Sequence, residues 1–266
     1  MVAEIQQPGI LDGSAIILVG PRYPENIGAS ARIAFNFGIN QLIVVTDEYY
    51  DKERMLKMAT HKAAHLIQNM KIYRDTADAV APFQFIVGTT AMQGRHRVLE
   101  QTPREIMAEL APLAANNRVA LMFGPENTGL TNRDLDFCQF MSTIPTADFS
   151  SLNLAQAVAI HCYELVLATS SYNSADISDS DYANSHQLEG MFSHIEEALT
   201  TTTYLGEHNT NYWMRNIRQF LSRVKVKKKE ASMIRGICRK FLWHYGVYGQ
   251  KDNEQNAEVG EMLKKQ

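Results

Sequence analysis

Short runs of apolar residues alternate with longer segments of helical periodicity through about the first 170 residues of the chain. Such runs are typical of buried strands, and the segments between them are typical of helices that cover a sheet. This alternation predicts an α/β domain with a mostly parallel sheet and helices on both faces. The expected strands are residues 15–19, 42–45, 85–87 and 119–123, with a short apolar run ending at Ile144, and the expected helices are residues 26–37, 52–68, a segment from Pro103, and 152–168.

The remainder of the chain differs in composition. Residues 171–187 are rich in Ser, Asp and Asn and lack periodicity, which predicts a linker after a domain of residues 1–170. A helical unit is expected over residues 188–250. The polar, aperiodic stretch 251–266 is expected to be a disordered tail.

Composition excludes several classes of protein. A chain of 266 residues with 45% hydrophobic content can bury a large core. It contains no basic leader followed by an apolar stretch and no apolar run near the ~20 residues that cross a bilayer, so we expect a cytoplasmic protein without membrane contact. Cys138, Cys162 and Cys238 are widely spaced and odd in number, which favours reduced structural thiols, and no metal site is expected.

Three polar motifs each lie at or just past the carboxyl end of an apolar run. They are Asn26-Ile-Gly-Ala-Ser-Ala-Arg32, Phe123-Gly-Pro-Glu-Asn-Thr-Gly-Leu130 and Ser150-Ser-Leu-Asn153. Open α/β sheets bind their ligands at this end of the strands. The three motifs therefore predict one active-site crevice.

The glycine-rich motif excludes the common nucleotide-binding loops. Its glycine spacing is that of a P-loop, but Leu130 stands where the phosphate-binding Lys belongs, and the chain contains no G-x-G-x-x-G. This argues against an ATPase and against a dinucleotide-dependent oxidoreductase. Glu126, the only charge in the loop, suits a cationic or hydroxyl-bearing ligand such as S-adenosylmethionine. The alternative is a tight turn that needs both glycines.

The first motif contains two candidate functional residues. Asn26 is expected to cap a helix, its commonest role at such a position. Arg32 has mostly apolar sequence neighbours, so we expect it to be buried with a partner. That partner would be Glu25 or Glu126 in a structural ion pair, or a phosphate or hydroxyl of the substrate.

Cations gather in the C-terminal part of the chain. Residues 213–240 contain ten Lys and Arg residues against one Glu, with aromatic residues interleaved. This pattern favours a surface that binds structured RNA, whereas a solvated helical face is the alternative. The candidate RNA-binding residues are Arg215, Arg218, Arg223, Lys227, Lys228 and Lys229.

The three motifs, in this order and separation, resemble those of the SPOUT superfamily of RNA methyltransferases, specifically the TrmH-like branch that methylates ribose 2′-hydroxyls. The resemblance covers roughly residues 14–168. It implies S-adenosyl-L-methionine as cofactor, a trefoil-knotted fold and a homodimer. The C-terminal extension resembles the helical tail of bacterial enzymes that methylate tRNA at cytidine or uridine, at the first nucleotide of the anticodon loop.

The resemblance also assigns roles by position. The reacting site would contain Asn26, Arg32, Glu126, Ser151 and Asn153, and the cofactor site would contain Thr89, Thr90, Ala91, Gly124, Ile144, Ser150, Ser151 and Leu152. The family account makes Arg32 the general base. Because a guanidinium rarely gives up its proton, binding a phosphate and stabilising the developing alkoxide is an equally sound role.

One departure from the family pattern concerns the substrate. Met92 stands where a substrate-facing Arg usually follows the residues 88–91, so Arg95 is the expected replacement. Methylation of another tRNA site or of rRNA is the alternative activity. A non-catalytic RNA-binding protein of the same fold is the alternative class, although the intact motifs argue against it.

The last helix of the first domain bears on oligomeric state. Its apolar residues exceed what one domain face needs, which fits a dimer contact, and core packing is the equal alternative. The residues concerned are Leu154, Val158, Tyr163, Leu165 and Leu167.

Overall fold

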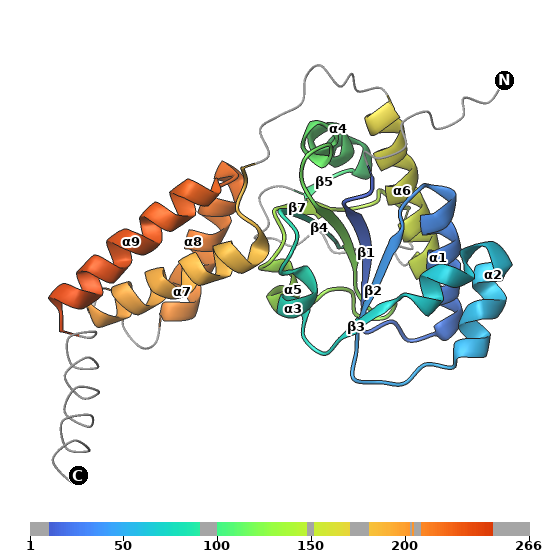
Figure 1. The fold of residues 1–266 in the computed structure, drawn as a ribbon, viewed down its shortest axis with the longest axis horizontal. Helices are drawn as coiled ribbons and strands as arrows, with labels where there is room; N and C mark the ends of the chain where they lie inside the picture. Colours follow the sequence, from blue (N-terminus) through green and yellow to red (C-terminus); the bar gives the residue numbers. More distant parts are fainter. Residues whose placement is uncertain are drawn as a thin grey trace, which may run out of the picture. The chain divides into compact units, whose positions relative to one another are not determined.

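A computed structural model describes residues 11–90, 100–147, 152–170, 181–202, 204 and 209–246. The chain separates into two compact units, residues 1–185 and 186–266. The first unit is an α/β domain and the second is helical (Figure 1). The α/β class predicted from the alternation of apolar runs and helical segments is confirmed.

A parallel sheet of seven strands forms the centre of the first unit, in the order β3-β2-β1-β6-β4-β7-β5. The strands predicted from the sequence appear with boundaries shifted by at most two residues, whereas β3 and β5 carry no apolar run. The bounds are β1 Ser14–Val19, β2 Gln41–Val45, β3 Lys71–Tyr73, β4 Phe85–Thr89, β5 Glu100–Gln101, β6 Val119–Phe123 and β7 Phe140–Ser142.

Helices cover both faces of this sheet (Figure 1). One face packs against α1 (Pro24–Asn36), α2 (Lys52–Gln68), α4 (Pro103–Ala114) and α6 (Leu154–Ser170), and the other against α3 (Thr76–Val80) and α5 (Asn132–Leu135). Alternate residues of each strand point to opposite faces, so Ile16 and Leu18 enter the first core, whereas Ile17 enters the second. The central strands are buried on both faces, which explains why their sequences are continuous apolar runs.

Local chemistry sets the helix starts around the site. Pro24 stands in the first turn of α1, where its missing N–H costs nothing. Asp51 caps α2 by accepting from the backbone N–H of Glu53 at 2.9 Å. Gly28 lets α1 and α2 approach closely, because a Cβ there would lie 2.1 Å from the carbonyl oxygen of Met55.

The end of the predicted linker is packed rather than free. The Tyr182 ring lies 5.2 Å from that of Phe85, Ala183 is buried, and the Ser185 N–H donates to the carbonyl of Phe83 at 2.8 Å. The next helix, α7 (Ser185–Thr201), begins three residues before the expected Leu188. Residues 251–266 lie outside the described part, and the trefoil knot stays a prediction because the path from β4 to α6 includes residues 91–99 and 148–151, which are also outside it.

The second unit contains α7, α8 (Thr210–Val224) and α9 (Lys228–His244). Its buried side chains include Met191 and Phe192 of α7, Met214 of α8, and Cys238 and Leu242 of α9. Arg218 strengthens the contact of α7 with α8, since its guanidinium pairs with both Glu189 carboxylate oxygens and lies 4.4 Å from the Phe192 ring centre. No helix in the described part of the chain combines the length and apolarity needed to cross a bilayer.

Candidate functional site

Polar side chains from the three motifs meet at the carboxyl edge of the sheet. Asn26 Nδ2 donates to Glu126 Oε1 at 2.5 Å, and Asn153 Nδ2 donates to Asn26 Oδ1 at 3.1 Å. We call these three residues the polar cluster. Residues that lie 100 and 127 positions apart are thus in direct contact, as expected of motifs that line one crevice.

Asn26 has a different local role from the one predicted. Helix α1 begins at Pro24 and its N-cap residue is Tyr23, so Asn26 already lies inside the first turn. Its side chain is buried and uses both amide atoms within the polar cluster. The prediction that Asn26 caps the helix was wrong because the proline starts the helix earlier in the sequence.

Both carboxylate oxygens of Glu126 accept hydrogen bonds, one from a backbone N–H and one from a side chain. Its Oε2 accepts from the N–H of Arg22 at 2.9 Å, while Oε1 accepts from Asn26. Each carboxylate oxygen therefore has a protein donor. The carboxylate ties the loop after β6 to the loop after β1 and fixes the rotamer of Asn26.

Both glycines of the second motif have a structural reason. A Cβ on Gly124 would lie 2.2 Å from the backbone nitrogen of Leu130, and Gly129 has φ +66°. The Gly129 N–H donates to the carbonyl of Pro125 at 2.8 Å and closes the turn. The turn that needs two glycines is also the turn that presents Glu126.

Asn153 joins helix α6 to the polar cluster. Its Oδ1 accepts from the N–H of Ala155 at 2.9 Å and so caps α6, while its Nδ2 donates to Asn26. Leu152 beside it is half-buried. Ser150 and Ser151 lie outside the described residues, so their predicted contacts with cofactor and substrate stay predictions.

Arg32 is exposed on α1, which contradicts the expected burial. Its apolar sequence neighbours occupy the opposite side of the helix, where Ile27, Ala31 and Ala34 enter the core. Glu25 pairs instead with Arg54 at 2.7 Å, and Glu126 is taken by Asn26 and Arg22. The guanidinium of Arg32 makes no hydrogen bond or ion pair with any residue that the structure describes, so neither expected structural partner holds it.

The proposed cofactor residues come from the ends of three neighbouring strands, β6, β4 and β7. Thr89 Oγ1 donates to the carbonyl of Met122 at 3.3 Å, and the Thr90 N–H donates to the carbonyl of Ser142 at 2.9 Å. Half-buried Ile144 follows β7, and Gly124 follows β6. Ala91 lies outside the described residues.

A buried histidine that sequence reasoning missed supports two of these strand ends. His161 Nδ1 donates to the carbonyl of Ala157 at 2.8 Å, which leaves Nε2 to accept from Ser142 Oγ at 2.8 Å. The ring also meets the Phe123 ring edge-on, with centres 5.3 Å apart. Burial lowers the pKa of His161 from 6.5 to about 4, and the hydrogen bond to Ala157 opposes this only weakly. The imidazole is therefore neutral at physiological pH.

The candidate RNA-binding residues divide by environment. Arg218 is engaged with Glu189 and packs inside the second unit, which assigns it a structural role. Lys229, Arg215 and Arg223 are exposed, and Lys227 and Lys228 are half-exposed. Arg95 and Met92 lie outside the described residues. RNA contact by these residues stays a prediction.

The three cysteines are free and buried, in agreement with structural thiols. Burial raises the pKa of Cys162 to about 12, so its thiol is unreactive. Among the described residues no group of three or more His, Cys, Asp or Glu side chains is placed to hold a metal ion.

Comparison with known proteins identifies the class. The family described as SpoU rRNA Methylase family matches residues 13–163, more than half of the chain. The chain belongs to this family and is an RNA ribose 2′-O-methyltransferase. A second family, described as tRNA methyltransferase TrmJ, C-terminal domain, matches residues 186–255, which include helices α7 to α9.

Individual relatives point in the same direction. The chain is 30% identical over 240 residues to the tRNA (cytidine/uridine/adenosine-2′-O-)-methyltransferase TrmJ of Pseudomonas aeruginosa, covering 86% of this chain and 93% of the relative. It is 28% identical over 221 residues to the tRNA (cytidine-2′-O-)-methyltransferase TrmJ of Methanocaldococcus jannaschii, covering 82% and 94%. The crystal structure of TrmJ from Z. mobilis ZM4 superposes with a TM-score of 0.73 at 29% identity, covering 85% of this chain and 98% of that one.

Proposed function

We propose that this protein transfers a methyl group from S-adenosyl-L-methionine to the ribose 2′-hydroxyl of a cytidine or uridine at the first nucleotide of the tRNA anticodon loop. The observation that carries the proposal is the contact of Asn26, Glu126 and Asn153, with Arg32 exposed on the same helix as Asn26 and without a hydrogen bond or ion pair to any described residue. These contacts bring residues of all three motifs together at one edge of the sheet, and linked hydrogen bonds fix the orientation of their side chains.

The residues present fit the cofactor. Gly124 lets the loop after β6 fold tightly against its own backbone at Leu130, and half-buried Ile144 and Leu152 offer apolar surface for an adenine ring. Thr89 and Thr90 are held by neighbouring strands, so the loop they begin starts from a fixed position. When bound, S-adenosyl-L-methionine would supply an electrophilic methyl group on a sulfonium, and transfer would release S-adenosyl-L-homocysteine and pass the hydroxyl proton to water.

The protein contributes orientation and charge stabilisation. Holding the reactants at near-attack distance is worth up to about 7–11 kcal/mol. Arg32 binds the phosphate of the target nucleotide and stabilises the oxygen as its negative charge develops, because a guanidinium is a strong double donor and a poor base. Asn26, fixed by Glu126 and Asn153, orients the ribose through its remaining hydrogen-bonding capacity.

The match of the second unit to the TrmJ C-terminal domain supports tRNA as the substrate. The relatives' names differ in the nucleosides they give, and cytidine is common to those quoted above. The family description mentions rRNA, so an rRNA ribose is the second candidate substrate. One assay on total RNA separates the two.

A homodimer is also proposed. Leu154, Val158 and Leu165 are buried in the core of the first unit, so core packing accounts for them. Tyr163 and Leu167 on the same helix remain 50% and 42% exposed and supply apolar surface for a partner copy. Sedimentation at micromolar concentration is expected to show a dimer that the Tyr163→Glu substitution weakens, and a monomeric parent protein would contradict it.

The decisive assay mixes the purified chain with methyl-labelled S-adenosyl-L-methionine and unmodified tRNA or rRNA, and maps the labelled ribose. Arg32→Lys is expected to lower kcat by at least about 100-fold with cofactor affinity retained. Arg74→Lys, a control at an arginine whose side chain is 92% exposed, is expected to leave both unchanged. Absence of label in every RNA would refute the activity, and parallel loss of cofactor binding in Arg32→Lys would make that arginine structural.

A further inference from the structure

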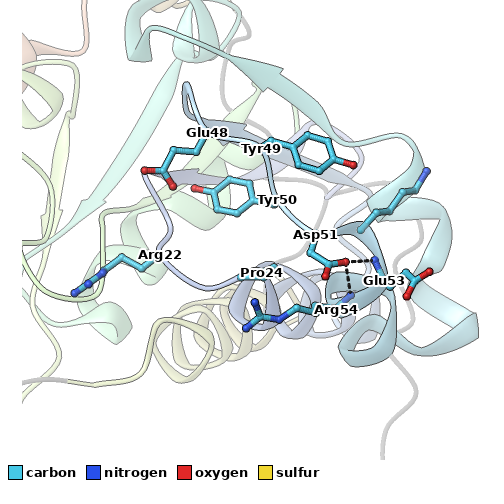
Figure 2. A pocket seen from close by; sticks show the side chains of 9 residues that line it. Arg22, Pro24, Glu48, Tyr49, Tyr50, Asp51, Glu53 and Arg54 are labelled. Carbon is cyan, nitrogen blue, oxygen red and sulfur yellow. Dashed lines mark hydrogen bonds between the residues drawn. The ribbon is translucent and has the colours of Figure 1, made fainter.

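An open cavity of about 680 Å³ lies in the first unit between the loop after β1 and the loop after β2. Figure 2 shows Arg22, Glu48 and Tyr50 along one side and Asp51 and Arg54 along the other. Its size is within the range of about 300–1,000 Å³ that small-molecule sites occupy. Neither the predicted reacting residues nor the predicted cofactor residues line it.

The strand order places this cavity next to the polar cluster. β2 pairs with β1 on the side away from β6, whereas the cofactor loops follow β6, β4 and β7. Along the carboxyl edge of the sheet the order is therefore cavity, polar cluster, cofactor loops. The Arg22 N–H donates to Glu126 at 2.9 Å, so one wall of the cavity is a single hydrogen bond from the polar cluster.

Internal bonds hold the cavity walls in place. The Tyr50 hydroxyl donates to the carbonyl of Pro21 at 2.5 Å and joins the two loops. Asp51 caps α2, and Arg54 pairs with Glu25. These side chains are held by bonds within the protein, and those bonds fix the cavity walls.

The exposed lining side chains also include Lys52 and Glu53, and three others are placed to contact a ligand. Tyr49 is 92% exposed, and the Arg22 guanidinium and the Glu48 carboxylate form no hydrogen bond or ion pair with any described residue. A flat ring, a cation and a carboxylate do not suit a bare phosphate, because the carboxylate repels it. They suit a nucleotide, which has a base to stack, amino or imino hydrogens to donate and a phosphate to accept.

We propose that this cavity binds the nucleotide adjacent to the methylated one in the RNA, with its base stacked on Tyr49, its base edge donating to Glu48 and its phosphate bound by Arg22. This inference rests on the proposed function. A nucleotide held here lies on the far side of the polar cluster from the cofactor loops, so it orients the target ribose between them. The cavity would then select the RNA by its neighbouring base.

The test combines two protein variants with two RNA changes. Tyr49→Ala is expected to lower kcat/KM for the tRNA substrate by about tenfold, equivalent to about 1.4 kcal/mol, with cofactor affinity unchanged. Tyr49→Phe keeps the ring and is expected to restore the parent value. Ile72→Ala, at an exposed residue of β3 outside the cavity, is the control and is expected to behave like the parent.

The RNA changes are transcripts with an abasic nucleotide immediately 5′ or 3′ of the target. One of them is expected to lose about tenfold in kcat/KM with the parent enzyme and to show no further loss with Tyr49→Ala, because both changes remove the same contact. Independent losses that multiply, or no effect of Tyr49→Ala, would overturn the inference while leaving methylation intact. If the parent enzyme labels no RNA, the proposed function fails instead.

Discussion

The buried His161 makes the first unit sensitive to acid, and the size of the effect follows from its environment. In the folded chain the pKa of His161 is lowered to about 4 by burial, whereas the unfolded value is 6.5. Between pH 4 and pH 6.5 this histidine binds a proton in the unfolded chain but stays neutral in the folded chain. Stability contributed by this residue is therefore complete above pH 6.5 and is lost as pH falls toward 4.

The shift corresponds to about 3 kcal/mol over the whole window and about 2 kcal/mol by pH 5. A domain of this size is stabilised by roughly 5–15 kcal/mol, so the loss is a substantial part of the total. Protonation would also reverse the bond to Ser142 Oγ, because Nε2 can then only donate and the hydroxyl must rotate to accept. The ends of β6 and β7 should loosen together, since the ring contacts Phe123 as well.

Urea unfolding of the full chain between pH 7 and pH 5 measures this effect. Both tryptophans, Trp213 and Trp243, lie in the second unit, so far-ultraviolet circular dichroism and hydrogen exchange must report on the first. His161→Gln is expected to be less stable at pH 7 but to lose about 2 kcal/mol less on acidification. His61→Gln, at an exposed histidine of α2, is the control and is expected to follow the parent. Identical pH dependence of parent and His161→Gln would refute the reasoning.

Three further substitutions test other parts of the structure. Thr60 in α2 has φ 61° and ψ 172°, backbone angles that residues with a side chain rarely adopt. Thr60→Gly is therefore expected to raise the free energy of unfolding by about 1 kcal/mol, measured in urea. A lower free energy of unfolding would contradict the presence of strain. Gly124→Ala places a Cβ against the backbone of Leu130 and is expected to weaken S-adenosyl-L-methionine binding by at least about tenfold, measured by calorimetry. Unchanged affinity would show that the loop accommodates the methyl group without distorting the cofactor site. Arg218→Ala removes the ion pair with Glu189 and is expected to destabilise the second unit by about 1 kcal/mol. Tryptophan fluorescence should then show unfolding at a lower urea concentration. An unchanged midpoint would contradict a structural role and leave RNA binding as the role of this arginine.

Much of the sheet could be predicted because its central strands are buried on both faces. Residues 119–123 of β6 are all apolar and all buried, and the pattern needs no tertiary information to be recognised. The two-residue β5 and the three-residue β3 are too short to carry any pattern. They form only because a neighbouring strand offers free hydrogen-bonding groups.

Three residues differ from what the sequence predicted or indicated, each for its own reason. Arg32 was expected to be buried because its neighbours in the sequence are apolar, yet on a helix those neighbours face another direction. Asn26 was expected to cap a helix because local preference favours it, yet Pro24 had already begun the helix. The burial of His161 could not be predicted from the sequence. A polar residue in an apolar helix is expected at the surface unless the residues packed against it are known.

From the sequence alone the α/β class, the helical second unit and the three motifs after their strands were determined, because burial of a strand or helix face leaves a local pattern. Only the tertiary structure decided that Asn26, Glu126 and Asn153 touch and that Arg32 is exposed, with no hydrogen bond or ion pair to the residues described. It also decided that a cavity adjoins them. The physical reason is that contacts between residues 100 and 127 positions apart depend on strand order, and neighbours in this sheet are mostly not neighbours in the chain.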